Sequence, residues 1–245
     1  MTVFDDLAAE QERLEGILGG LDEAQWRSPS GAAGWTIADV VLHLAQSEES
    51  VVATVSGRDL RTGLSGRADG TVDELMAEWV RAERGPTPDV VFGRWQRARR
   101  AALDALRGAQ PDRPLRWVAA PVKPATLATT RLAEHWAHGL DITGPFGIEF
   151  PDTERLRHVA WLAHRTLPYA MTRAGEQPAA VWCELTAPDG RSVWEFGPRE
   201  ADSAIAGAAG EFCRVAAQRL APADSGLTTS GPHGATALRL IRTYA

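Results

Sequence analysis

In the first part of the chain, apolar residues recur three, four or seven positions apart, which is the spacing of helices that bury one face. Phe4, Leu7 and Leu14 begin the first such series, and Gly19-Gly20 interrupts it. The same spacing predicts further helices from Thr36 into the mid-fifties, from Val72 to Arg84, from Pro88 past Leu106 and from Ala125 to Ile142. Packed together, these segments most simply form an antiparallel four-helix bundle.

Two of these helices carry start signals. Thr36 and Asp39 have the spacing of a capping box, in which the hydroxyl and the carboxylate bind free amide groups of the first turn. Thr87 before Pro88 places a capping residue ahead of a proline at the first helical position. The glycine-, arginine- and serine-rich residues 57–70 are predicted to form a loop between helices.

The pattern changes after Gly147. A helix is expected over about residues 153–173, and two short β-like runs, residues 181–186 and 192–196, flank a Pro-Asp-Gly turn and predict a hairpin. Further helices are expected near residues 207–220 and 235–244. The predicted fold class is therefore α+β, with a helical bundle at residues 1–147 and a small α+β domain at residues 148–245.

Composition narrows the class of protein. The 245 residues are 44% hydrophobic, which is enough for an ordinary globular core. The 32 acidic and 26 basic residues give a net charge of -6, which disfavours a nucleic-acid partner. No apolar run is long enough for a membrane span, and the acidic start does not resemble a secretory signal, so we expect a cytoplasmic protein with no membrane partner. Cys183 and Cys213 have no metal-like spacing and are expected to be reduced core residues.

Candidate metal ligands lie in the last helix of the bundle. Glu134 and His138 are four residues apart, so their side chains share one helix face and can share an ion. His43 lies mid-helix among valine and leucine residues, where an unpaired imidazole would cost about 1–3 kcal/mol, and it is the best third ligand. Two imidazoles and one carboxylate suit Zn²⁺, with Ni²⁺ or Fe²⁺ as alternatives, and three protein ligands leave positions open for catalysis.

The residues alone leave other interpretations open. A Glu/His pair at this spacing is often a solvated surface pair, and a lone histidine on an apolar face is often a hydrogen-bonded core residue. His135 is a rival ligand, because it stands three residues from His138. Asp141 can accept a hydrogen bond from the second ring nitrogen of His138, or it can be a surface acid at the helix end.

Three segments, residues 34–44, 130–141 and 207–219, resemble the mycothiol-dependent maleylpyruvate isomerase family within the DinB-like helical bundle superfamily. The resemblance rests on the pattern Trp-Thr-x-x-Asp-x-x-x-His-Leu that starts at Trp35 and on Arg-x-x-Glu-x-x-x-His-x-x-Asp that starts at Arg131. It implies that His43, Glu134 and His138 hold a divalent metal. It also implies a C-terminal domain that helps to bind the thiol cofactor mycothiol, with Arg219, or alternatively Arg214, as the contact.

The resemblance implies an isomerase or S-transferase that uses mycothiol and acts on a small electrophilic metabolite. A hydrolase or hydratase that uses metal-bound water is one alternative, and a non-catalytic small-molecule binding protein, its pocket lined by some of the nine tryptophans, is another. The basic residues are nearly all arginine, which fits an actinobacterial host. No heptad pattern is long enough to predict a coiled-coil interface, so a monomer and a homodimer both remain open.

Overall fold

The structure is a computed structural model that describes residues 2–58, 72–117 and 120–243. The chain divides into two compact units, Met1–Phe150 and Pro151–Ala245. The expected loop at residues 57–70 falls almost entirely outside the described residues. No helix among the described residues is both long enough and apolar enough to cross a membrane.

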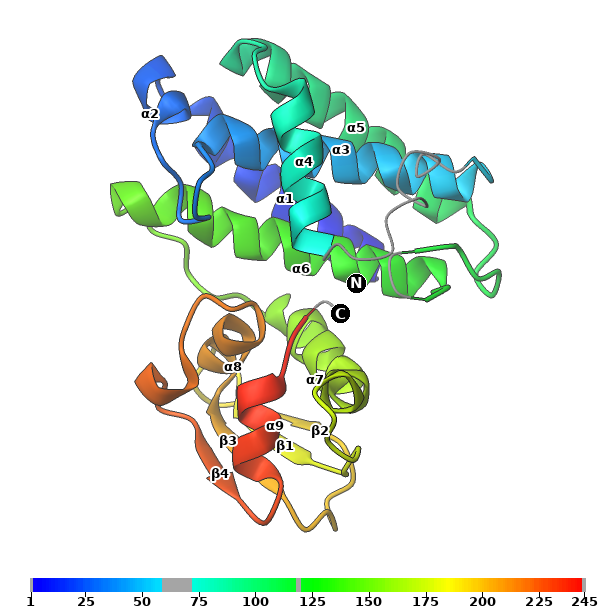
Figure 1. Cartoon of the computed structure of the whole chain (residues 1–245), viewed down its shortest axis with the longest axis vertical. Coiled ribbons are helices and arrows are strands. Elements are labelled where there is room, and N and C mark those ends of the chain that lie inside the picture. The colour runs from blue at the N-terminus through cyan, green and yellow to red at the C-terminus, as the bar shows by residue number, and fades with distance from the viewer. Residues whose placement is uncertain (1, 59–71, 118–119, 244–245) are drawn as a thin grey trace. The chain divides into compact units, whose positions relative to one another are not determined.

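The first unit is helical, as the apolar spacing predicts (Figure 1). Its elements are α1 (Val3–Gly19), α2 (Glu23–Arg27), α3 (Ile37–Val55), α4 (Val72–Glu83), α5 (Pro88–Gly108), α6 (Pro124–Thr143) and a short 3-10 turn, η2 (Gly144–Phe146). The capping box at the start of α3 is confirmed, because Asp39 Oδ2 accepts from the Thr36 amide and hydroxyl at 2.9 Å each. Thr87 precedes Pro88 at the start of α5 as expected, but its side chain makes no capping hydrogen bond.

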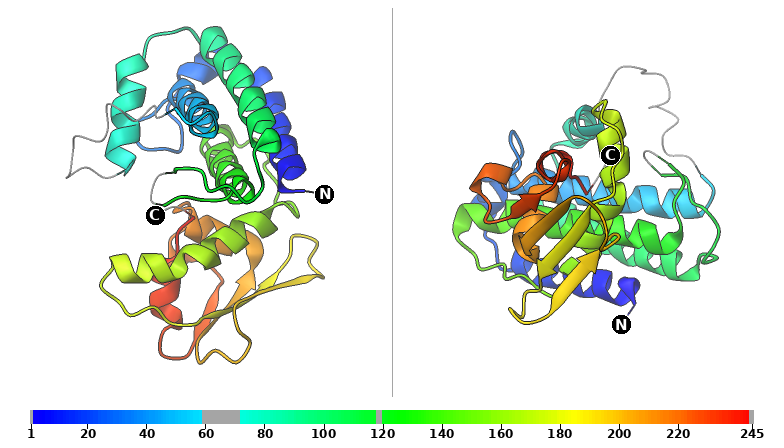
Figure 2. Two further views of the ribbon diagram at one scale, coloured as in Figure 1. Left: turned by 90° about the vertical axis from the view of Figure 1, so that its right-hand side faces the viewer. Right: turned by 90° about the horizontal axis from the view of Figure 1, so that it is seen from below.

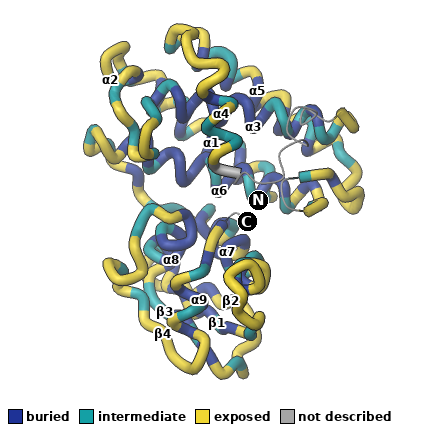
Figure 3. Tube along the Cα trace, viewed as in Figure 1, coloured by how far each residue is buried: buried dark blue, intermediate teal, exposed yellow. Residues whose placement is uncertain are grey.

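The four long helices surround a common interior, and α4 lies outside against α3 (Figure 2). α1 and α6 run in one direction and α3 and α5 in the other, while α4 crosses them and ends near the start of α5 (Figure 1). Ion pairs follow the antiparallel neighbours α1 and α5: Arg107 pairs with Asp5 at 3.0 Å, and Arg99 pairs with Glu15. α3 is buried along most of its length (Figure 3), which is why a polar residue on it must find its partner inside the bundle.

The second unit is a four-stranded sheet covered by helices. Its elements are α7 (Leu156–Arg173), β1 (Trp182–Thr186), β2 (Val193–Phe196), β3 (Ala204–Ala208), α8 (Ala209–Ala216), a short 3-10 turn η3 (Pro222–Asp224), β4 (Thr228–Ser230) and α9 (Gly234–Leu240). The strand order is β2-β1-β3-β4. β1 and β2 form the predicted hairpin, whereas β3 runs parallel to β1 and antiparallel to β4.

The sequence interpretation was wrong about the start of the helix expected over residues 207–220. Gly207 and Ala208 belong to β3, whose run of alanine and glycine has little β preference of its own and becomes a strand through pairing with β1 and β4. α8 ends at Ala216 because Gln218 adopts the left-handed conformation with φ 62°. The Arg219 amide then bonds the Arg214 carbonyl at 2.8 Å in a Schellman arrangement. α9 likewise stops at Leu240, short of the predicted residue 244.

The end of the first unit is fixed by one ring. Phe150 lies beneath the guanidinium of Arg13, whose Cζ is 3.6 Å from the ring centroid. The ring also lies against Gly139 on α6, where an added Cβ would come within 2.4 Å of Phe150 Cζ. Glycine at this position therefore lets the segment after α6 pack closely against the bundle.

We expect Gly139→Ala to lower the free energy of unfolding by about 1–3 kcal/mol, because the new methyl group overpacks the Phe150 site. Gly16→Ala is the control, since its Cβ would meet nothing within 4 Å on an exposed helix face, and it should stabilise α1 by about 0.5–1 kcal/mol. Urea unfolding in the presence of a chelator measures both. Equal stability of Gly139→Ala and the wild type would refute this packing argument.

Candidate metal centre

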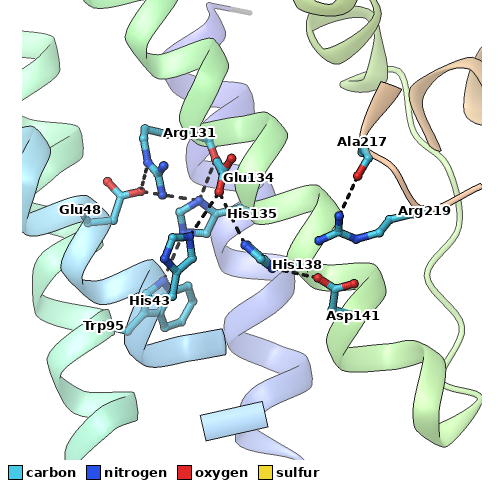
Figure 4. A network of polar contacts seen from close by, with 10 residues as sticks. All are labelled: His43, Glu48, Trp95, Arg131, Glu134, His135, His138, Asp141, Ala217 and Arg219. Atoms are coloured by element: carbon cyan, nitrogen blue, oxygen red, sulfur yellow. Dashed lines mark hydrogen bonds and ion pairs between the residues drawn. The ribbon is translucent and has the colours of Figure 1, made fainter. Parts of the chain in front are cut away.

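Three potential ligands meet where α3 faces α6 (Figure 4). His43 projects from α3, and Glu134 and His138 project from successive turns of α6. Glu134 Oε2 lies 3.4 Å from His43 Nε2 and 3.6 Å from His138 Nε2. One ligand atom from each of the three lies within 4.8 Å of those of the other two, and no other such group of histidine, cysteine or carboxylate side chains occurs among the described residues.

Asp141 holds the His138 ring. Its Oδ2 lies 2.9 Å from His138 Nδ1, so Nδ1 carries a proton and donates a hydrogen bond to the carboxylate. The other ring nitrogen, Nε2, faces Glu134 and is the atom that would bind a metal once it is deprotonated. Burial alone would lower the pKa of His138, but the hydrogen bonds to Asp141 and Glu134 outweigh it and raise the pKa. Of the two roles considered for Asp141, the structure shows the orienting one.

The charges at the site are set by mutual contacts. Burial lowers the pKa of His43, so its imidazole is neutral near pH 7. Burial alone would raise the pKa of Glu134, but hydrogen bonds with His138 and His43 hold it well below its usual value. Neutral imidazoles and an ionised carboxylate are the forms in which these side chains bind metals.

The donor set fits a divalent ion. Ligand atoms about 2.1 Å from one ion stand roughly 3–4.2 Å from each other, and both imidazole–carboxylate distances, 3.4 and 3.6 Å, lie in that range. The same distances are long for hydrogen bonds. In addition, His43 Nδ1 is buried without a hydrogen-bond partner among the described residues, so the pair with Glu134 is the sole polar contact seen for this ring.

His135 is turned away from the triad. Its Nδ1 lies 2.8 Å from the Arg131 carbonyl oxygen, which can only accept, so Nδ1 carries the proton. Trp95 Nε1 donates to His135 Nε2 at 3.2 Å. Both ring nitrogens are thus engaged in a network separate from Glu134. Burial, assisted by the charge of Arg131, lowers the pKa of His135 to about 3.

A buried ion pair that the sequence interpretation did not single out lies beside His135. Arg131 Nε donates to Glu48 Oε1 at 2.9 Å, with side-chain exposures of 3% and 0%. Burial raises the pKa of Glu48, although Arg131 opposes that shift. The sequence offered little signal for this pair, because Glu48 stands in the polar run Gln46-Ser-Glu-Glu-Ser50.

The two arginines predicted to contact a cofactor lie in the second unit. Arg214 on α8 forms a bidentate pair with Asp152, at 2.8 and 2.9 Å, and Gly210 leaves room for that carboxylate. Arg219 lies just beyond the left-handed residue Gln218, and its Nη1 donates to the Ala217 carbonyl at 2.7 Å. Arg214 is thus paired with an acidic side chain of its own unit.

The family model described as the mycothiol maleylpyruvate isomerase N-terminal domain matches residues 7–143. This range is more than half of the chain and includes all three residues of the triad. The chain belongs to the mycothiol maleylpyruvate isomerase family. Membership confirms the resemblance seen in the motifs around His43 and Glu134.

Two relatives from Mycobacterium tuberculosis extend over almost the whole chain. Uncharacterized protein MT0041 of strain CDC 1551 / Oshkosh and Uncharacterized protein Rv0036c of strain ATCC 25618 / H37Rv are each 30% identical over 246 residues, which is 98% of this chain and 94% of theirs. The similarity to these two relatives therefore extends over both units.

Solved structures of the mycothiol-dependent maleylpyruvate isomerase and of a histidine-to-alanine mutant share the fold. Each superposes with a TM-score of 0.63 at 15% identity and covers 94% of this chain and 95% of the solved chain. At this identity the likeness shows the architecture, a helical domain followed by a small α+β domain, and confirms the predicted fold class.

We expect His135→Gln to flatten the pH dependence of stability. Below pH 6.5 the unfolded chain takes up a proton at His135 that the folded protein accepts only near pH 3, so the wild type loses stability as the pH falls through this window. Removing one such group should reduce the slope by about 1.4 kcal/mol per pH unit. Urea unfolding of the metal-free wild type and variant at pH 4, 5 and 6 measures this slope. An equal dependence of the unfolding free energy on pH in the two proteins would contradict a neutral His135.

Proposed function

We propose that this chain is a metal-dependent enzyme that uses mycothiol to isomerise a small electrophilic metabolite, or to transfer the thiol to it. The observation that carries the proposal is the triad of His43, Glu134 and His138, which offers one ion three ligands and leaves coordination positions open. Family membership supplies the reaction class, and the solved relative named for maleylpyruvate supplies the first substrate to test.

The chain lacks an accessible thiol of its own among the described residues. Cys183 and Cys213 are both buried and unpaired. Burial raises the pKa of Cys183 to about 12 and also raises the pKa of Cys213. A buried thiol with a raised pKa is a poor nucleophile at neutral pH. An external low-molecular-weight thiol is therefore required for thiol chemistry in this fold.

The triad would hold Zn²⁺, or alternatively Ni²⁺ or Fe²⁺, through His43 Nε2, Glu134 and His138 Nε2. Such an ion stabilises a thiolate at neutral pH. Asp141 keeps His138 in the ligating tautomer, and Glu134 contributes the negative charge of the ligand set. Arg219, or alternatively Arg214, is proposed to bind a carboxylate of the cofactor or substrate, as the family resemblance implies.

The chemistry follows from adding sulfur to a conjugated double bond. The thiolate forms a carbon–sulfur bond, the double bond becomes a single bond, and the adjacent carbonyl takes up the electron pair. Rotation about that single bond and loss of the thiolate return a double bond of opposite geometry, with no net change in atoms. Protonation in place of thiolate loss gives a stable thioether, which is the transferase outcome.

Elemental analysis should find about one equivalent of a divalent metal in the wild type, as expected for a single three-ligand site. His43→Ala and Glu134→Ala should lose it, because two remaining ligands bind weakly. His135→Gln is the matched control, since it changes the neighbouring histidine whose ring nitrogens are both engaged elsewhere. Metal loss in that control, or a wild type that stays metal-free after incubation with Zn²⁺, Ni²⁺ and Fe²⁺, would refute the site.

Turnover should depend on the thiol. With metal-loaded protein and maleylpyruvate, we expect isomerisation only when mycothiol is added, followed by the change in absorbance of the conjugated acid. Co²⁺-substituted protein should also show a sulfur-to-metal charge-transfer band on thiol addition, and His43→Ala should not. Turnover that is independent of the thiol would favour a metal-bound water as nucleophile, and a thiol band without turnover of any tested electrophile would favour a binding protein.

A further inference from the structure

The segment before α3, residues 28–36, forms a tight loop that we call the Trp35 loop. Its two ends are joined, because the Ile37 amide bonds the Ser28 carbonyl at 3.1 Å and the Ser30 amide bonds the Trp35 carbonyl at 2.8 Å. Its middle is tied to α6, where the Gly31 amide donates to the Asp141 carbonyl at 2.8 Å. An added Cβ at Gly31 would lie 3.0 Å from Asp141 Cα, so the loop backbone touches the helix directly.

The Trp35 ring lies against both histidines of the triad. Its centroid is 5.1 Å from that of His43 at an angle of 51°, and 6.3 Å from that of His138 in a stacked arrangement at 20°. The two imidazoles are themselves 5.1 Å apart, edge to face. Three rings therefore pack on one another, and the indole touches the two histidines without being a ligand.

The two histidines differ in how their rings are held. A metal-binding histidine usually donates its second ring N–H to an acceptor, which fixes the ring orientation. His138 follows this rule through Asp141. His43 does not: its Nδ1 is buried and meets no hydrogen-bond partner in the part of the chain that the structure describes. On the side away from Glu134, the His43 ring is restrained by packing against other rings, of which the Trp35 indole is the largest.

We propose that Trp35 is a positioning residue that holds the His43 imidazole in its metal-binding orientation by ring packing, in the place where a hydrogen-bond acceptor normally acts. The inference rests on the proposed metal centre. It assigns the tryptophan of the Trp-Thr-x-x-Asp-x-x-x-His pattern a task at the metal site, in addition to any share in the bundle core.

Arg84 extends this support to the far side of the loop. Its Nε donates to Asp39 Oδ1 at 2.8 Å and its Nη2 to the Gly34 carbonyl at 3.1 Å. Asp39 is also the capping residue that bonds Thr36, so one carboxylate joins the α3 start to the residue after α4. Gly34, with φ 78°, turns the chain directly before Trp35. Arg84 therefore fixes the backbone that aims the indole.

The test is the dissociation constant for Zn²⁺, measured by chelator competition on chelated and reloaded full-length protein. Trp35→Ala should weaken binding by about 10–100-fold, the range seen when the support of a metal ligand is removed. Trp35→Phe keeps an aromatic ring and should weaken it less than tenfold. Arg84→Gln should weaken it in the same direction by less than Trp35→Ala. Trp161→Ala removes an indole that packs on Arg165 instead of histidine and should leave affinity unchanged.

Two further readouts separate positioning from general loss of structure. Urea midpoints of the metal-free proteins show whether each variant is folded, and the visible spectrum of Co²⁺ reports the geometry of its ligands. A folded Trp35→Ala with weaker metal binding and an altered Co²⁺ spectrum supports the inference. Wild-type affinity and spectrum in Trp35→Ala would overturn the inference alone, whereas a wild type without metal would overturn the proposed function and this inference together.

Discussion

The interface between α3 and α6 buries charged and polar side chains, and this burial is the most costly feature of the fold. Glu48 and Arg131 are almost completely buried, and they are tolerable there because each neutralises the other. Removing one partner of such a pair costs about 3–5 kcal/mol, since the other charge is left without water. The ion pair therefore favours the alignment of α3 with α6 in which His43 lies opposite Glu134 and His138.

Two groups of polar side chains lie at the interface between α3 and α6. One is a closed network, in which the hydrogen-bonding atoms of the histidine have partners, and the other is an open group, in which they face a possible ligand. In the closed network, His135 donates to the Arg131 carbonyl and accepts from Trp95, so its ring nitrogens have no remaining capacity. In the open group, His138 is satisfied on one side by Asp141, while its Nε2 and that of His43 face the Glu134 carboxylate at distances too long for good hydrogen bonds. His135 and His138, three residues apart, thus differ in role: both ring nitrogens of His135 are engaged within the bundle, whereas Nε2 of His138 faces Glu134 in the triad.

The sequence predicted the helical bundle well because helix periodicity, the capping box and the apolar face of α3 are all local signals. It also placed Glu134 and His138 on one face, since residues four apart are neighbours on a helix. It left His135 open as a rival metal ligand, because residues three apart on a helix also lie close together. What distinguishes His135 from His138 is its contact with Trp95, which lies on another helix. It misread β3, whose alanines and glycine become a strand only through pairing with β1 and β4.

The residues that support the site could not be predicted either, because their contacts join distant parts of the chain. Arg84 reaches the Gly34 carbonyl across fifty positions of sequence, and no local pattern predicts such a contact. Likewise, no spacing rule reveals that His43 lacks an acceptor for its second nitrogen, because that is a statement about everything packed around it. A ring held by packing has a weaker angular restraint than one held by a hydrogen bond, so in the proposed metal centre His43 would adjust more easily than His138 when the coordination number changes. Of the two histidines, His138 would then act as the fixed reference and His43 as the adaptable one.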